Sequence, residues 1–122
     1  MRNMSFSLTT EQVRDRSKTV TRRLGWWDLQ PGTILQAVEK AQGLKKDEHV
    51  KPICLIRVTS SRDERLDSIE RLGSMFGPIE TAREGFPDLT PEQFVSMFIE
   101  HNKRDGVYPD TIVNRIEFEY LP

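Results

Sequence analysis

Hydrophobic and polar residues alternate most regularly near the C-terminal end of the chain, over residues 112–120. One face of this stretch carries Ile112, Asn114, Ile116, Phe118 and Tyr120, and the opposite face is largely polar. A period of two indicates a half-buried β-strand, which makes this the strongest strand signal in the sequence. Asn114 is the polar exception on the apolar face, so we expect it to have a hydrogen-bond partner if it is buried.

Four shorter stretches predict further strands. Residues 3–8 alternate in the same way, and residues 19–23 are rich in β-branched side chains. Residues 34–40 and 53–60 are apolar runs separated by a polar loop, and we interpret both as strands.

The clearest helix is predicted to begin after Thr90. Thr90 is an N-cap candidate, Pro91 suits the first helical position, and Gln93 completes a capping box. The apolar spacing that follows extends this helix to about Asn102. Two shorter helices are predicted over residues 10–16, where Thr9 and Gln12 form a second capping pattern, and over residues 66–72. We expect the glycines and the proline of residues 73–78 to interrupt the chain.

The order of these elements is strand, helix, strands, helices and strand, which favours an α+β fold. We predict a small β-barrel, mostly antiparallel, with helices packed around it. The length of 122 residues suits one domain, residues 1–122, with one core. No internal repeat or low-complexity tract is present.

Composition excludes several classes of protein. No apolar run approaches the ~20 residues that a membrane-spanning helix needs, so we expect a cytoplasmic protein without a membrane partner. Cys54 is the only cysteine, and His49 and His101 lie far apart, so we expect no zinc site, no other metal and no cofactor. An isoelectric point near 6.1 argues against a protein that coats nucleic acid by bulk charge.

Positive charge is nevertheless concentrated in one segment. Residues 14–23 contain five basic side chains and a single acidic one, Asp15, whereas the whole chain has a formal charge of −1. The last six residues of this segment read Lys18-Thr19-Val20-Thr21-Arg22-Arg23. Such a cluster can bind phosphate, and a lysine beside arginines loses its proton more easily than usual.

Several motifs in a fixed order resemble the ASCH domain, part of the PUA-like superfamily. They are Lys18–Arg23, Pro31-Gly32, Ile53–Ser60, Glu84-Gly85-Phe86-Pro87, the helix from Thr90, and Arg115–Phe118. The resemblance covers about residues 4–121. It implies a β-barrel with a cleft that recognises RNA or a modified nucleoside.

One enzymatic branch of this family, a small bacterial amidohydrolase, removes the acetyl group from N(4)-acetylcytidine. By position, the resemblance implies that Lys18 is the base, Thr21 the nucleophile and Glu84 the acid, while Arg23 orients the substrate. The chain departs from that enzyme in being longer and in carrying Gly25-Trp26-Trp27 and the loop with Lys45 and Lys46.

The chemistry of amide hydrolysis sets two conditions on these residues. A threonine hydroxyl needs a base, and a lysine serves as one only if its pKa falls by roughly 3 units. Residues three apart on a regular strand point to opposite faces. Lys18 therefore meets Thr21 only if it lies in the loop before the strand, or if the strand is bulged there.

The same basic segment is compatible with two alternatives, a non-catalytic RNA-binding module and a metal-independent ribonuclease. Arg22 and Arg23 would contact the RNA or nucleoside, and Trp26 or Trp27 would stack on a base. We expect one of these tryptophans to be packed and the other exposed. Lys45 and Lys46 are candidates for a second phosphate contact, or for an ordinary solvated loop.

Overall fold

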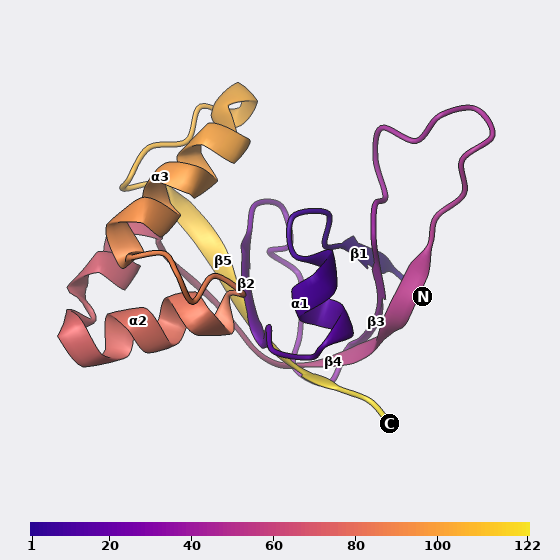
Figure 1. Ribbon diagram of the computed structural model, residues 1–122, viewed down its shortest axis with the longest axis horizontal. Helices are drawn as coiled ribbons and strands as arrows, with labels where there is room; N and C mark the ends of the chain where they lie inside the picture. Colours follow the sequence, from indigo (N-terminus) through magenta and orange to yellow (C-terminus); the bar gives the residue numbers. More distant parts are fainter.

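The computed structural model describes the whole chain, Met1–Pro122, as a mixed five-stranded sheet with helices on one side (Figure 1). The strand order is β1-β3-β4-β5-β2. The strands are β1 (Asn3–Ser5), β2 (Val20–Arg23), β3 (Ile34–Val38), β4 (Pro52–Arg65) and β5 (Ile112–Tyr120). Only the β1–β3 pair is parallel, so the sheet is mostly antiparallel, as predicted.

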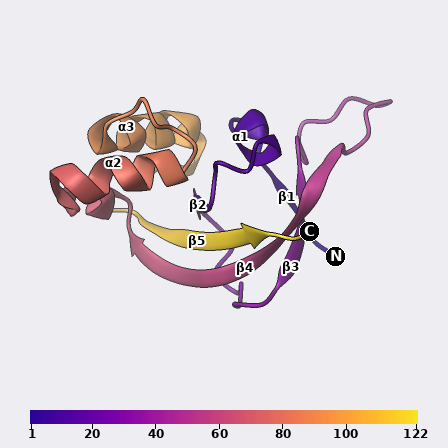
Figure 2. The same ribbon diagram turned by 60° about the horizontal axis from the view of Figure 1, so that its bottom comes forward.

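The sheet does not close into the predicted barrel. β1 and β2 are its two edges, and strong bending of β4 and β5 curves the sheet between them (Figure 2). A side chain bridges the two edges, because Arg23 of β2 donates a hydrogen bond from Nη2 to the backbone oxygen of Ser5 at 2.6 Å. The barrel closure is therefore not confirmed, whereas the α+β class is.

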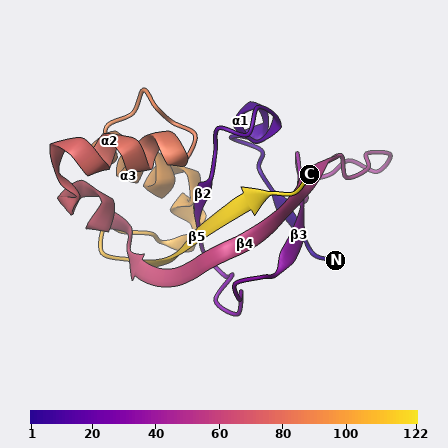
Figure 3. The same ribbon diagram turned by 90° about the horizontal axis from the view of Figure 1, so that it is seen from below.

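The helical elements divide into two groups. The helices are α1 (Thr10–Arg14), η1 (Leu66–Arg71), α2 (Gly73–Arg83), α3 (Pro91–His101) and η2 (Lys103–Asp105). α2 and α3 lie side by side, and α1 lies apart from them across β2 (Figure 3). None of these helices has the length and hydrophobicity that crossing a bilayer requires.

Of the two predicted capping boxes, the structure contains one. At α3 the Thr90 side chain accepts from the Gln93 backbone and the Gln93 side chain accepts from the Thr90 backbone, so the capping box is confirmed. At α1 the prediction is wrong, since Thr9 makes no side-chain cap. Gln12 instead donates to the backbone oxygen of Gly85 at 3.0 Å, a long-range contact that the local pattern does not contain.

The predicted interruption over residues 73–78 is also wrong, because α2 runs through it with Pro78 inside. Pro78 removes one backbone donor in the second turn. Gly77 has a packing role: a Cβ atom there would lie 2.8 Å from Cγ of Pro91 on α3. The glycine therefore lets the two helices approach closely, and tertiary packing overrides the local signal of a break.

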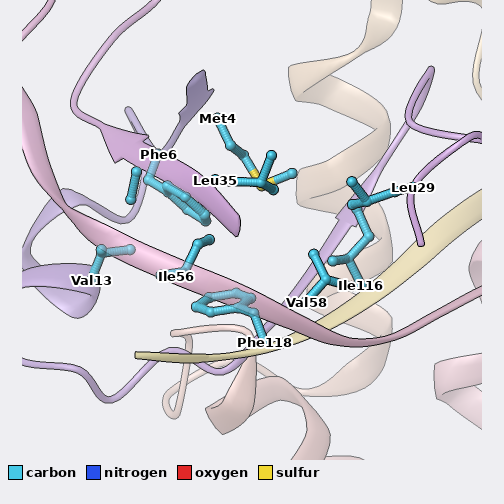
Figure 4. Packing of buried hydrophobic residues seen from close by; sticks show 10 residues of the cluster. Met4, Phe6, Val13, Leu29, Leu35, Ile56, Val58, Ile116 and Phe118 are labelled. Atoms are coloured by element: carbon cyan, nitrogen blue, oxygen red, sulfur yellow. The ribbon is translucent and has the colours of Figure 1, made fainter. Parts of the chain in front are cut away.

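The hydrophobic core consists of two clusters rather than the single core predicted. The larger one lies between the sheet and α1 and is centred on Phe6, Leu35, Ile56 and Phe118 (Figure 4). The smaller one lies under the helical layer and includes Ile69, Phe94, Val95 and Phe98. β5 belongs to both, through Val113 in the smaller cluster and Ile116 in the larger.

Candidate functional site

A cleft of about 560 Å³ lies beside the open edges of the sheet. Ser5 of β1, Thr21 of β2 and Phe94 of α3 are among the residues that line it. Its lining also contains Lys18, from the loop before β2, and Glu84, the C-cap residue of α2. The three side chains singled out in the sequence thus come from two segments that are far apart along the chain, and they line one cleft.

Lys18 and Glu84 form a buried ion pair in the wall of this cleft. Nζ of Lys18 donates to Oε1 of Glu84 at 3.0 Å and to the Glu84 backbone oxygen at 2.5 Å, and both side chains are 3% exposed. Burial lowers the pKa of Lys18, Glu84 opposes this, and the positive charges of Arg23 and Arg22 lower it further. The direction agrees with the sequence argument, but burial is a larger cause than the arginines.

Thr21 is buried on β2, and its hydroxyl faces a different partner. Oγ1 accepts a hydrogen bond from Nε of Arg23 at 3.0 Å, and it shares none with Nζ of Lys18. Lys18 lies in the loop before Val20, where β2 begins, which is one of the two placements that the strand geometry allows. The Thr21 hydroxyl is therefore held by a cation, and its proton is free for another acceptor.

Arg22 lies at the centre of an internal charge network and is 1% exposed. Nη1 donates to Glu84 at 3.0 Å, and Nη2 donates to Glu64 at 3.0 Å and to Glu80 at 2.8 Å. Its Nε is buried without a partner. The guanidinium also lies 5.9 Å from the ring centroid of Phe94. Three carboxylates pair with Arg22, so its positive charge is compensated inside the protein and Arg22 is not a free cation.

Three residues of this network, Glu64, Glu80 and Arg115, were not predicted as site residues from the sequence. Arg115 of β5 makes a two-bond contact with Glu80 of α2, with Nε to Oε2 at 2.7 Å and Nη2 to Oε1 at 3.0 Å. Burial alone would raise the pKa of Glu80, but the hydrogen bonds from Arg115 and Arg22 lower it to about 2. The spacing of four between Glu80 and Glu84 was an available signal, since it places both carboxylates on one helix face.

Arg23 is half-buried, and it differs from Lys18, Arg22 and Arg115 because no carboxylate forms a salt bridge with it. It donates to Thr21 and Ser5, and its guanidinium lies 4.8 Å from the ring centroid of Phe6. Burial lowers its pKa to about 10, against the influence of Glu84. Arg23 therefore presents a positive charge to the cleft that the protein itself does not neutralise.

The two tryptophans are divided as predicted. Trp26 is half-buried and lines the cleft, with the Arg2 guanidinium 4.3 Å from its ring centroid, whereas Trp27 is 51% exposed and outside the cleft. The Trp26 backbone N–H donates to Oδ1 of Asn114 at 3.1 Å. Asn114 also donates to Asp63 at 3.3 Å, so it has the partners expected of a buried amide.

Lys45 and Lys46 lie on the exposed loop between β3 and β4 and do not line the cleft. Lys40, just after β3, does line it, although an exposed ion pair with Glu48 at 3.6 Å engages its charge. No group of three histidine, cysteine or acidic side chains is placed to hold a metal ion.

Comparison with solved structures identifies the fold. No protein-family model and no curated protein sequence matches the chain. In structure it is similar to an ASCH domain from Lactobacillus crispatus JV V101, with a TM-score of 0.60 and 18% identity over 98% of this chain and 78% of that one.

Two further structures are similar. Protein EF3133 from Enterococcus faecalis V583 has a TM-score of 0.66 and 17% identity, over 99% of this chain and 76% of that one. The hypothetical protein PH0355 has a TM-score of 0.60 and 15% identity, over 98% of this chain and 96% of that one. The protein thus has the fold of an ASCH domain, as the sequence motifs implied.

Proposed function

We propose that the cleft binds a modified nucleoside and hydrolyses the amide of its acylated base, with N(4)-acetylcytidine as the first substrate to test. The proposal depends on one observation, the presence of Lys18, Thr21 and Glu84 in the lining of a single cleft. The ASCH fold supports it, because the enzymatic branch that the sequence resembles uses these residue types at the corresponding positions.

The Lys18–Glu84 pair supplies both a base and an acid. Transfer of one proton from Nζ of Lys18 to Oε1 of Glu84, along their 3.0 Å hydrogen bond, leaves a neutral amine and a neutral carboxylic acid. Burial lowers the pKa of Lys18 and so favours the loss of this proton. Arg22 opposes it by stabilising the carboxylate, but its charge is shared with Glu64 and Glu80.

The proposed reaction then uses four side chains in turn, those of Lys18, Thr21, Arg23 and Glu84. The neutral Lys18 amine takes the Thr21 proton as Oγ1 attacks the acetyl carbonyl, and Arg23 stabilises the negative charge on the oxygen. The carboxylic acid of Glu84 donates its proton to the amine of the nucleobase as that amine leaves. Glu84, now a carboxylate, takes a proton from a water molecule as its oxygen attacks the acetyl-threonine ester, and the Lys18 ammonium returns its proton to Thr21 Oγ1. Acetic acid leaves, and the neutral amine and carboxylic acid are restored.

The charge distribution favours a small ligand over a nucleic-acid backbone. Lys18, Arg22 and Lys40 are paired with carboxylates, so of the lysines and arginines in the lining only Arg23 is unpaired. Binding along a phosphate backbone requires several free cations in a row. A cleft of about 560 Å³ is within the usual size range for small molecules, and Trp26 in its lining offers a ring for stacking on a base.

The test is release of cytidine from N(4)-acetylcytidine by the purified protein. We expect turnover that Thr21→Ala lowers by about a thousandfold and that Thr21→Ser partly retains, because serine keeps the hydroxyl. Lys45→Ala, outside the cleft, is the matched control and keeps full activity. Absence of turnover, or equal turnover by Thr21→Ala, would refute the hydrolase.

A second candidate, recognition of RNA or a nucleoside without hydrolysis, is favoured by the unpaired charge of Arg23 in the cleft. It predicts that affinity for cytidine-containing RNA falls as salt rises and drops for Arg23→Ala. Binding that depends on neither the salt nor this arginine would exclude it.

A further inference from the structure

α2 has an inverted distribution of polarity for a surface helix. Its buried residues are small or polar, namely Gly77, Glu80 and Thr81. Its large apolar side chains point outward: Leu72 at the N-cap is 40% exposed, Met75 68%, Phe76 61% and Ile79 51%. A surface helix normally buries its apolar stripe and exposes its polar one, so this outer face is suited to contact with another apolar surface.

These four residues form a continuous stripe, which we call the α2 stripe. Their spacing of i, i+3, i+4 and i+7 places them on one side of the helix, over two turns. No charged residue occurs between Arg71 and Glu80, and Glu80 is buried. Figures 1 and 3 show α2 at the periphery of the molecule, with no other element outside it.

We propose that the α2 stripe is the interface of a two-fold symmetric dimer, in which α2 of one copy packs antiparallel on α2 of a second copy. The stripe is symmetric about the midpoint between Met75 and Phe76. An antiparallel pair therefore places Leu72 against Ile79 of the second copy, and Met75 against Phe76 of the second copy. A two-fold interface requires this property, since the same surface must complement itself.

The apolar character of the α2 stripe favours a second copy of this chain as its partner over a nucleic acid or a charged protein. The stripe offers four apolar side chains and no lysine or arginine, so it has nothing to pair with phosphates or carboxylates. Along the sequence the nearest charged residues that are not buried are Glu70 and Arg71 before the stripe and Arg83 after it. An apolar centre with a charged rim is the usual anatomy of a protein–protein contact.

The size of the surface sets the strength of the dimer. A standard interface buries about 800 Å² on each partner, which is more than one short helix face provides. We therefore expect a weak dimer that forms between about 10 µM and 500 µM protein. None of the stripe residues lines the cleft, so dimerisation leaves the candidate site open.

Sedimentation equilibrium of the full chain between about 5 µM and 1 mM tests the proposal. The weight-average mass is expected to rise from the monomer value of 14.2 kDa towards twice that value. Phe76→Glu is expected to remain monomeric at every concentration. Tyr108→Glu is the matched control, because Tyr108 is a similarly exposed aromatic residue outside the stripe, and it should associate like the original chain.

Disulfide cross-linking tests the orientation of the two helices, in a Cys54→Ser background. Mixing Leu72→Cys with Ile79→Cys should give the mixed disulfide, whereas either variant alone should cross-link at least tenfold less. Circular dichroism establishes that each variant is folded. A chain that is monomeric at 1 mM, association unchanged by Phe76→Glu, or preferential linkage of Leu72→Cys to itself would each overturn the proposal.

Discussion

The carboxylate of Glu84 divides its two oxygens between Lys18 and Arg22, one at 3.0 Å from each. All three side chains are nearly inaccessible to solvent. Removing one member of a buried group of charges leaves the others without compensation, which costs more than the net value of the pair. Glu84 is therefore both a candidate acid and a structural requirement.

Glu84→Gln is expected to lower the free energy of unfolding by about 3–5 kcal/mol, because buried Lys18 loses its only carboxylate partner and Arg22 loses one of its three. Urea denaturation followed by circular dichroism measures the change. The control is Glu119→Gln, which removes an exposed ion pair with Arg57 at 2.9 Å. This control should cost less than about 1 kcal/mol, and equal losses in the two variants would contradict the argument.

At the scale of single elements, local signals predicted those helices and strands whose pattern lies within the element itself. The alternation over 112–120 matches β5, and Thr90 with Gln93 marks the start of α3 as predicted. The failures have long-range causes. β4 continues to Arg65, beyond the predicted residue 60, because its polar second half pairs with β5.

The contact between Gly77 and Pro91 gives a prediction for α2. Glycine to alanine in a helix interior usually stabilises it by about 1 kcal/mol. Gly77→Ala should instead destabilise the protein by about 1–3 kcal/mol, because the new methyl group would lie 2.8 Å from Cγ of Pro91. Urea denaturation of Gly77→Ala, Pro91→Ala and the double variant measures this. The loss should disappear in the Pro91→Ala background, and a loss of the same size there would exclude the clash.

At the scale of the whole molecule, a layer of buried charges separates the two hydrophobic clusters. Arg22 lies against Phe94 of one cluster, while Arg23 lies against Phe6 of the other. Glu80 and Arg115 tie α2 to β5 across this layer. The helical half and the sheet half are therefore joined partly by ion pairs, whose strength depends on pH.

Glu80 should make the stability of the fold pH-dependent in acid. Its pKa is lowered from 4.5 to about 2 in the folded chain, so its contribution is complete above pH 4.5 and is lost as the pH falls towards 2. We expect Glu80→Gln to cost about 3 kcal/mol at pH 7, with the difference from the original chain shrinking below pH 4.5. Urea denaturation from pH 7 to pH 2.5 measures it. A difference that is constant with pH would contradict the assignment.

The candidate site was only partly predictable from the sequence, because part of it depends on contacts between elements that are distant along the chain. Lys18, Thr21 and Glu84 came from motifs in a recognisable order, and the structure places them in one cleft. Glu64, Glu80 and Arg115, which complete the charge network around Arg22, were not predicted as site residues. Arg115 lies on what the alternation identified as the polar face of β5, and only the packing of α2 against that face buries it. A pattern of period two cannot report which helix covers a strand.

The position of β2 at the sheet edge has a consequence for the order of events during synthesis. β5 is the only strand to which β2 hydrogen-bonds, and about ninety residues separate them along the chain. The Phe118 backbone N–H donates to the backbone oxygen of Thr19, and the Tyr120 hydroxyl donates to the backbone oxygen of Lys18. In a nascent polypeptide, the segment that contains Thr21 therefore has no strand to pair with until residues 112–120 have left the ribosome. The cleft is assembled only once β5 is in place, and a chain stalled before that point carries Lys18 and Thr21 without the strand that fixes their positions.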